Sequence, residues 1–331
     1  MGITMEELAK LAKVSQGAVS LVLNGKAKGQ ISQKKQDLIR SLAKEHNYRM
    51  NMAARGLRKQ RQYTVGVIMP AALNMFYASL VALLQNGFSE RGYMTLFSFF
   101  KGDDFEKIYN SLCERQVDGI ISWENSPLLQ KDEIPVVLFC NDVNEKIRKR
   151  GDACRFGQCG FDFNDSYLRL FGHLYASGHR KIGFLGNTGD TRCLLLEHFL
   201  QEKGIFDSSR YFFHCKDELA ADNVLFEKIL SASDRPTAFV TTNDDTARQF
   251  ISAGTRLGVH FPGDISIAGF MNLPYTQFMY PALTTFDSRN NELARTMVEM
   301  LLSMIETPEE PVDDVFIQPE LILRDSCCKL G

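Results

Sequence analysis

The sequence predicts a protein of two parts: a small all-α domain with a helix-turn-helix, followed by an α/β core of two similar lobes, each built on a parallel sheet. Two observations lead to this fold class. Residues 1–62 carry 13 Lys/Arg and 4 Asp/Glu, a net charge of +9, whereas the remainder carries −11. Short helical patterns fill the basic segment, and apolar strands alternate with helical stretches after it. A basic module joined to an acidic body indicates a nucleic-acid partner.

Composition limits the remaining classes. The 331 residues are 44% hydrophobic and 24% charged, which is ordinary for a globular chain with room for two or three domains. No apolar run approaches the roughly 20 residues that span a bilayer, and no signal segment opens the chain. The eight cysteines show no Cys-x-x-Cys or Cys/His ligand spacing, so we expect reduced thiols. These features predict a cytoplasmic protein without a membrane segment, a metal or a cofactor.

The first helix of the basic segment has a clear start. Thr4 and Glu7 form a capping-box pattern, in which each side chain satisfies an amide of the other. A tight turn then leads to Ser15, which can cap a second helix that Asn24-Gly25 ends.

A third helix begins at Ser32 and runs to about His46. Two short helices joined by a tight turn and closed by a third form a helix-turn-helix unit, whose second helix enters a DNA major groove. Because these helices have small apolar faces, we expect the unit to be marginally stable alone.

The rest of the chain alternates apolar strands with helices, as in Tyr77–Arg91 and Leu168–Ser177. Continuous apolar strands between helices are typical of parallel sheets covered on both faces. The predicted strands are Thr64–Met69, Met94–Phe99, Gly119–Ser122, Pro135–Phe139, Lys181–Leu185, Tyr211–Cys215, Thr237–Thr242 and Ile265–Ala268.

The basic segment resembles the headpiece of the lactose-repressor (LacI) family over some 55 residues. The matching pieces, in order, are Glu7-Leu8-Ala9, Ala12-Lys13-Val14-Ser15, Val19-Ser20, Val22-Leu23-Asn24, Ile31-Ser32, Asn47-Tyr48, Asn51 and Ala54-Arg55-Gly56-Leu57. The resemblance implies a headpiece over residues 1–50 and a hinge helix and linker over 51–62. It implies DNA contacts at Thr4, Ser15, Gln16, Gly17, Ser20, Leu21, Asn24, Ser32, Tyr48, Asn51, Ala54, Arg55, Leu57 and Arg58.

Within this set, the resemblance makes Leu57 an apolar wedge in the minor groove, flanked by basic residues. Gln16 is the best candidate for reading a base edge, because a glutamine can bond adenine through both ends of its amide. Gly17 and Leu21 stand where many members carry polar or basic base-readers, and Leu21 can instead meet a thymine methyl. Lys13 replaces the usual turn glycine and is expected in a left-handed conformation.

The core resembles the periplasmic-binding-protein-like regulatory domain of the same family. The segments that carry the likeness include Ser177-Gly178-His179-Arg180, Pro262-Gly263-Asp264 and Leu283-Thr284-Thr285. The resemblance implies an N-terminal lobe of residues 63–162 plus about 289–318 and a C-terminal lobe of 163–288 plus about 319–331. It places a small-molecule effector between the lobes, at the carboxyl ends of the strands.

For the effector, the resemblance selects residues on the loops that follow the strands. Arg192 corresponds to an arginine that grips hydroxyl or carboxylate groups, although a surface ion pair is the alternative. Asn243 can bond a hydroxyl, although helix capping is the alternative. The full set is Asn74, Phe76, Tyr77, Cys140, Asp162, Arg192, Asn243 and Met271.

Three positions depart from the family's sugar-binding pattern. Cys140 and Met271 stand where many members have aspartate, and Phe163 stands where asparagine is usual. Losing a carboxylate that bonds two hydroxyls removes much of a sugar site's discrimination. A sugar or sugar derivative in an atypical pocket is expected, and a less polar, aromatic or anionic effector, or none, stays open.

No catalytic pattern points to an enzyme. The chain has no Gly-x-Ser-x-Gly, no phosphate-cradling loop and no His-Glu-x-x-His, and its six histidines are dispersed. We therefore predict a DNA-binding regulator that represses from a pseudo-palindromic operator as a homodimer, with a tetramer as the alternative. The competing hypothesis is a small-molecule-binding protein of the same core fold with a weak or vestigial headpiece.

Overall fold

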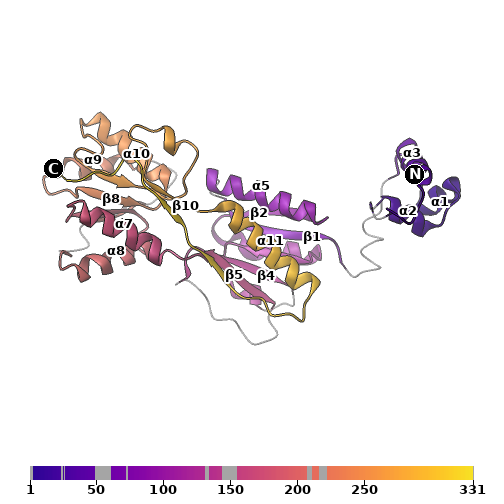
Figure 1. Ribbon diagram of the computed structural model, residues 1–331. Helices are drawn as coiled ribbons and strands as arrows, with labels where there is room; N and C mark the ends of the chain where they lie inside the picture. The colour runs from indigo at the N-terminus through magenta and orange to yellow at the C-terminus, as the bar shows by residue number, and fades with distance from the viewer. Residues whose placement is uncertain are drawn as a thin grey trace. The chain divides into compact units, whose positions relative to one another are not determined.

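The computed structural model describes residues 3–23, 25, 27–48, 61–71, 74–130, 134–143, 155–206, 211–215 and 222–330. The chain forms two compact units, Met1–Gln62 and Tyr63–Gly331. Each unit has its own hydrophobic core, and Figure 1 shows the helical unit at the N-terminus and the α/β unit that follows it.

The first unit consists of α1 (Met5–Ala12), α2 (Gln16–Leu23) and α3 (Gln33–Glu45). The predicted capping box is present: Glu7 N donates to Thr4 Oγ1 at 3.2 Å, and Thr4 N donates to Glu7 Oε2 at 2.8 Å. The core that the helices share is small, as expected, and its buried members are Leu8, Ala9, Ala12, Val19, Val22, Ala27 and Ile39.

The first lobe of the second unit is built on a parallel six-stranded sheet of order β11-β5-β4-β3-β1-β2. Side chains alternate between its faces, so that Val67 and Phe139 lie in one hydrophobic cluster and Ile68 and Leu138 in another. The strands are β1 (Thr64–Pro70), β2 (Met94–Phe100), β3 (Gly119–Ser122), β4 (Val136–Cys140), β5 (Phe156–Phe161) and β11 (Val315–Ile317).

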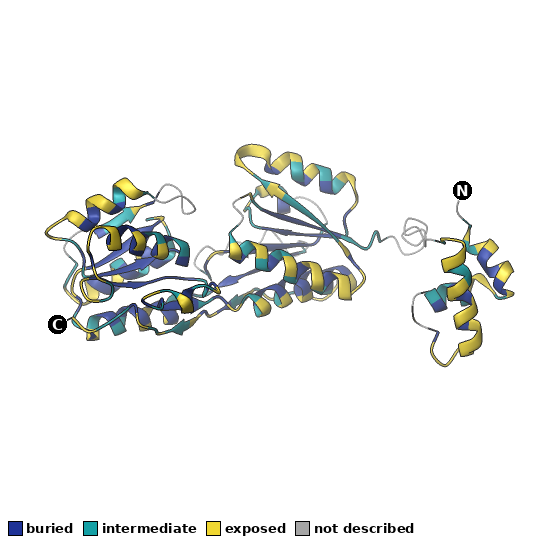
Figure 2. Ribbon diagram, turned by 90° about the horizontal axis from the view of Figure 1, so that it is seen from above, coloured by how far each residue is buried: buried dark blue, intermediate teal, exposed yellow. Residues whose placement is uncertain are grey.

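Helices cover both faces of this sheet (Figure 1). Helix α5 (Met75–Glu90) packs against α11 (Asn290–Glu306) on the face of Val67, and α6 (Phe105–Glu114) lies on the face of Ile68. Short 3₁₀ turns follow β2 and β3, at Gly102–Asp104 and Pro127–Gln130. The inner strands β1, β3, β4 and β5 are buried, the edge strand β2 is only partly so, and the helices expose their outer sides (Figure 2).

The second lobe has a parallel four-stranded sheet of order β7-β6-β8-β9. A separate antiparallel pair joins β10 (Thr285–Asp287) to β12 (Glu320–Ile322). The remaining elements are β6 (Ile182–Gly186), β7 (Phe212–His214), β8 (Ala238–Thr241), β9 (Ser266–Ala268), α7 (Asn164–Ala176), α8 (Thr191–Glu202), α9 (Asn223–Ser231), α10 (Asp244–Arg256) and a 3₁₀ turn at Thr276–Phe278.

The predicted fold class is confirmed: a helical N-terminal unit precedes an α/β core of parallel sheets. All the predicted strands form, with ends that differ by one residue at most, and β10, β11 and β12 form in addition to them. The strand Phe156–Phe161 was missed, because Gly157, Gln158 and Gly160 interrupt its apolar pattern. Gly160 is required there, since a Cβ on it would lie 1.8 Å from the carbonyl oxygen of Cys140 on the neighbouring strand.

Candidate functional site

Helix α2 presents a polar end to its surroundings. Val19 and Val22 are buried in the core of the first unit, whereas Gln16 and Gly17 are exposed. The Ser15 hydroxyl caps the helix by accepting from Ala18 N at 3.2 Å. The free amide of an exposed glutamine in the first turn is what base-edge reading requires of a recognition helix.

Leu21 is tied to the core more closely than the sequence pattern suggested. It is partly buried and packs against the cluster that contains Leu8 and Ile39. Its contact with a thymine methyl would therefore use only the part of the side chain left outside this packing. Ser20 is also partly buried.

The turn between α1 and α2 depends on Lys13. Its backbone has φ 51° and ψ 50°, the left-handed conformation expected from the missing glycine, and its amide bonds Ala9 O and Lys10 O. A lysine in this conformation costs roughly 1 kcal/mol relative to glycine. The turn therefore keeps the left-handed conformation that glycine would adopt there, although lysine occupies the position.

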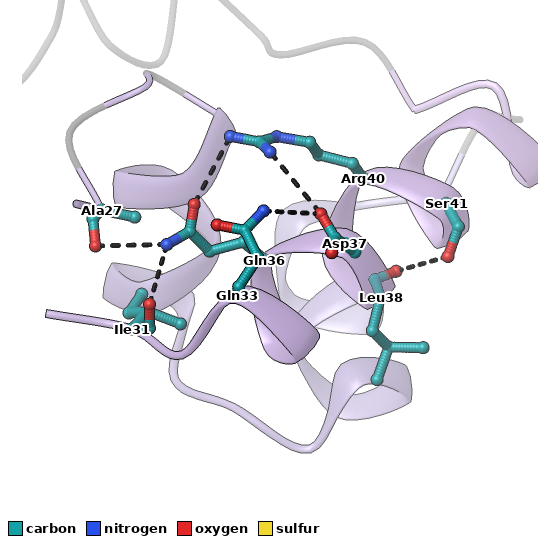
Figure 3. A network of polar contacts seen from close by, with 8 residues as sticks. All are labelled: Ala27, Ile31, Gln33, Gln36, Asp37, Leu38, Arg40 and Ser41. Atoms are coloured by element: carbon teal, nitrogen blue, oxygen red, sulfur yellow. Dashed lines mark hydrogen bonds and ion pairs between the residues drawn. The ribbon is translucent and has the colours of Figure 1, made fainter. Parts of the chain in front are cut away.

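The loop after α2 is held by Gln36, a buried polar residue of α3 (Figure 3). Gln36 Nε2 donates to Ile31 O at 2.7 Å and to Ala27 O at 3.5 Å. Arg40 Nη2 donates to Gln36 Oε1 at 3.5 Å and also lies near Asp37. This residue was missed from the sequence because one glutamine in a polar helix gives no periodic signal.

Only some of the other residues predicted to contact DNA lie in the described part of the structure. Thr4 and Ser32 are exposed at the starts of α1 and α3, and Ser32 makes no side-chain cap bond. Tyr48 is partly buried against the headpiece core, and burial raises its pKa. Asn24, Asn51, Ala54, Arg55, Leu57 and Arg58 lie outside the described residues.

Three of the predicted effector residues serve as local hydrogen-bond acceptors in the core. Asn74 Oδ1 caps α5 by accepting from Tyr77 N at 3.1 Å, and Asn243 Oδ1 caps α10 by accepting from Thr246 N at 2.8 Å. Asp162 Oδ1 accepts from Asn164 N at 3.1 Å and from Asn164 Nδ2 at 2.8 Å. The capping alternative considered for Asn243 is what the structure shows.

Arg192 is buried, and three of its five N–H groups donate to acceptors of the second lobe. Its Nε and Nη2 donate to the two oxygens of Asp190 at 2.7 and 2.5 Å, and its Nη1 donates to Thr242 O at 2.7 Å. Burial alone would raise the pKa of Asp190, but the charge and hydrogen bonds of Arg192 outweigh it and lower that pKa. The pair is neutral as a unit, and it is not the surface ion pair considered above.

Cys140 and Met271 lie in different hydrophobic clusters of the core. Cys140 ends β4 on the face that holds Phe105 and Leu129, opposite Phe139, and its Sγ contacts Gln158 Oε1 at 3.7 Å. Its thiol is turned away from Phe76 and Phe139, so we leave it out of the proposed site. Met271 is partly buried, with φ 111°, and packs against the cluster of Phe139.

Phe76 and Tyr77 belong to a chain of rings that runs from one lobe to the other. Phe76 is buried, with its centroid 5.2 Å from that of Tyr77 and 6.4 Å from that of Phe161. Phe161 in turn lies 5.5 Å from Phe270, which follows β9. The sequence did not predict a role for five of these aromatic residues, because the local pattern around each is that of an ordinary core residue. They are Trp123, Phe139, Phe161, Tyr167 and Phe270.

The guanidinium of Arg192 completes this chain. It lies 5.0 Å from the ring centroids of both Phe163 and Phe270, within the range of a cation–π contact. The position where the family's asparagine is usual is thus filled by a phenyl ring against a neutralised arginine.

Asp244 is a buried acid of the second lobe. Its Oδ1 accepts from Thr285 Oγ1 at 2.6 Å and its Oδ2 from Leu273 N at 2.8 Å, which ties α10 to the turn after Met271. Burial raises its pKa to about 7, although these two hydrogen bonds act to lower it. The described residues contain no group of three or more His, Cys, Asp or Glu side chains that could hold a metal ion.

The described part of the chain also holds no helix that is long and apolar enough to cross a membrane.

Comparison with known proteins places these features in a family. Residues 4–51 match the model described as bacterial regulatory proteins, lacI family, and residues 171–327 match a periplasmic binding protein-like domain. The NTD biosynthesis operon regulator NtdR of Bacillus subtilis is 28% identical, with 91% of this chain and 92% of that protein covered. Catabolite control protein A of Staphylococcus xylosus is also 28% identical, over 98% of this chain and 97% of that protein.

Among solved structures, the lac repressor dimer bound to operator and the anti-inducer ONPF superposes with a TM-score of 0.80 over the full length of both chains, at 21% identity. That likeness shows the fold. The two family matches, one to each unit in the expected order, and relatives aligned over nearly their whole length lead to one conclusion: the chain belongs to the LacI family of bacterial transcriptional regulators.

Proposed function

We propose that this protein is a repressor that binds a pseudo-palindromic operator as a homodimer, with a tetramer as the alternative, under the control of a small-molecule effector. The observation that carries the proposal is the exposed start of α2, with Gln16 and Gly17, on a unit of net charge +9. Basic residues neutralise phosphates, and a rigid helix presents the side chains that read bases. A regulatory role without catalysis, in the cytoplasm where the DNA lies, follows from the same proposal.

Homodimerisation supplies the symmetry that a palindrome needs. Two headpieces related by a two-fold axis address two half-sites about one helical turn apart, or a multiple of that spacing. The proposed hinge, residues 51–62, would order on the DNA with Leu57 inserted at the central step. The relatives named repressors in their own descriptions support this assignment.

The effector is proposed to act between two lobes, residues 63–162 with about 289–318 and residues 163–288 with about 319–331. The chain of rings from Phe76 to Phe270 crosses between these lobes and supports the placement. A ligand that binds one arrangement of the lobes more tightly shifts the equilibrium by its differential affinity. Of the predicted residues, Tyr77 and Met271 are partly exposed beside the rings and are proposed to meet the ligand.

A gel-shift titration on fragments of the source genome tests the DNA-binding part. Specific binding should weaken steeply with salt: the logarithm of the binding constant should fall linearly with the logarithm of the salt concentration, with a slope of about −0.9 for each phosphate that the protein neutralises. Gln16→Ala should weaken specific binding about tenfold, because one bidentate base contact is lost, and should leave the salt slope unchanged.

The matched control is Gln201→Ala, which removes an exposed glutamine from α8 of the core. It should bind DNA as the unaltered chain does. If no fragment is shifted at low salt, the chain is a small-molecule-binding protein with a vestigial headpiece and the proposal fails.

A further inference from the structure

We propose that the effector presents a planar aromatic ring bearing a hydrogen-bond acceptor to this protein, and not a face of sugar hydroxyls. The proposed site consists of a partly exposed rim, Tyr77 and Trp123, that would contact the ligand, and of a buried floor beneath it, Phe139, Phe161, Phe163 and Phe270. The inference rests on the proposed function for the ligand's regulatory role, while the binding itself is tested separately.

The floor forms because phenylalanines stand where strands of both lobes end. Phe139 precedes the last residue of β4, Phe161 ends β5, and Phe270 lies two residues beyond β9. The carboxyl ends of parallel strands are where such sheets bind ligands. The centroid of Phe161 lies 5.7 Å from that of Phe139, 5.6 Å from that of Phe163 and 5.5 Å from that of Phe270.

The rim differs from the floor in its exposure. The floor rings are buried, whereas Tyr77 and Trp123 are only partly buried. Trp123 stacks on Phe139 with the centroids 5.0 Å apart and an interplanar angle of 25°, and the Tyr77 ring lies edge-on to it at 6.4 Å. A flat ring laid against these two would extend an aromatic stack that the protein has already begun.

The groups that would bind a polyol are engaged elsewhere. Asn74 and Asn243 cap helices, and Asp162 accepts two bonds from Asn164. Arg192 directs its donors to Asp190 and to the carbonyl of Thr242. The hydroxyls of a sugar brought here would have to compete with these protein hydrogen bonds for their partners, and a hydroxyl left unpaired in a buried site costs binding free energy.

The indole nitrogen of Trp123 indicates that the ligand carries a hydrogen-bond acceptor. Nε1 is buried and has no hydrogen-bond partner among the described residues. An indole N–H can only donate, so the group that satisfies it must be an acceptor. A carbonyl or a ring nitrogen on an aromatic ligand would meet this need while its ring stacks on the rim.

Trp123 is the only tryptophan of the chain, so its emission reports on this surface alone. Three probes separate the possible sources of the ring: benzamide carries a ring and a carbonyl, phenyl β-D-glucoside carries the ring on a sugar, and glucose is the sugar alone. Full-length protein would be titrated with each probe under red-edge excitation. We expect saturable quenching by benzamide or by the phenyl glucoside and none by glucose; the stronger of the two quenchers identifies a free aromatic or an aryl glycoside.

Variants locate the binding. Tyr77→Leu should weaken binding of the quenching probe about fivefold, and Tyr77→Phe should retain most of the affinity. The matched control Tyr175→Leu removes a partly buried tyrosine of α7 that packs on Phe199, outside the floor and rim, and should not change it. Gel shifts on the same samples show whether DNA binding, and so the proposed function, holds independently. Quenching by glucose, no saturable response to either ring-bearing probe, or equal affinity in Tyr77→Leu would overturn the inference.

Discussion

At the scale of single residues, charge pairing decides what a side chain is free to do. Arg192 has the length and position of a ligand-gripping arginine, but Asp190, two residues earlier, takes two of its donors. The sequence shows both residues and cannot show that they face each other, because this depends on the φ and ψ angles at the start of α8. The carboxylate and the guanidinium stabilise each other's charge in a buried site.

Arg192→Ala should destabilise the core by about 3 kcal/mol, because it leaves Asp190 buried without its partner. The midpoint of urea unfolding of the full-length chain, followed by circular dichroism, measures this. Arg295→Ala is the matched control: Arg295 pairs with Glu299 on the exposed side of α11 and should cost no more than about 0.5 kcal/mol. Equal midpoints for the two variants would show that the buried pair has no special role.

Asp244 gives the core a pH dependence with a definite sign. Its pKa is about 7 in the folded chain, against 3.8 for an ordinary aspartate, so the folded state holds a proton that the unfolded state has lost between these values. Stability from this group is therefore complete at low pH and declines as the pH rises from about 4 to about 7.

In the unaltered chain, the titration of Asp244 lowers the free energy of unfolding by at most about 1.4 kcal/mol per pH unit in this window. Asp244→Asn should remove this decline, because asparagine does not titrate, and it keeps an oxygen that can accept from Leu273 N. Urea midpoints of the variant and the unaltered chain, compared across this range, measure the difference. Parallel profiles for the two proteins would mean that Asp244 does not titrate in this window.

At the scale of elements, the helices of the headpiece follow their local signals closely. The capping box at Thr4 and Glu7, the Ser15 cap and the left-handed Lys13 are all present as the sequence predicts. These features depend on neighbours within four residues, so local pattern is sufficient to predict them. The strand Phe156–Phe161 was missed because its local apolar pattern is interrupted, and its pairing with β4 and β11 depends on more distant parts of the chain.

Lys13→Gly should stabilise the headpiece by about 0.5–1 kcal/mol, because glycine adopts φ 51° without strain. Native-state hydrogen exchange of the amides in α1 and α2 measures the change in the full-length protein. Lys10→Gly makes the same substitution inside α1, three residues earlier, and should instead cost about 1 kcal/mol. If both variants lose protection, Lys13 is held by a contact that outweighs its backbone strain.

At the scale of the whole molecule, the sequence predicts the order of the parts better than the chemistry of the ligand site. Alternating strands and helices and the LacI-like motifs predict the fold and the place of the effector. The ring chain escaped prediction because Trp123, Phe161 and Phe270 lie far apart in sequence. Trp123 reaches Phe161 only through Phe139, and Phe161 meets Phe270 only where strands of the two lobes end near each other. What replaces the lost polar residues is visible only in three dimensions.

The central claim, a two-fold symmetric repressor that reads DNA with α2, is tested most directly by DNase I footprinting of the full-length protein on the genomic fragment that it shifts best. We predict one protected region with two inverted half-sites, lost in Gln16→Ala at concentrations where Gln201→Ala still protects it. Protection without inverted symmetry, or an undiminished footprint in Gln16→Ala, would contradict the account.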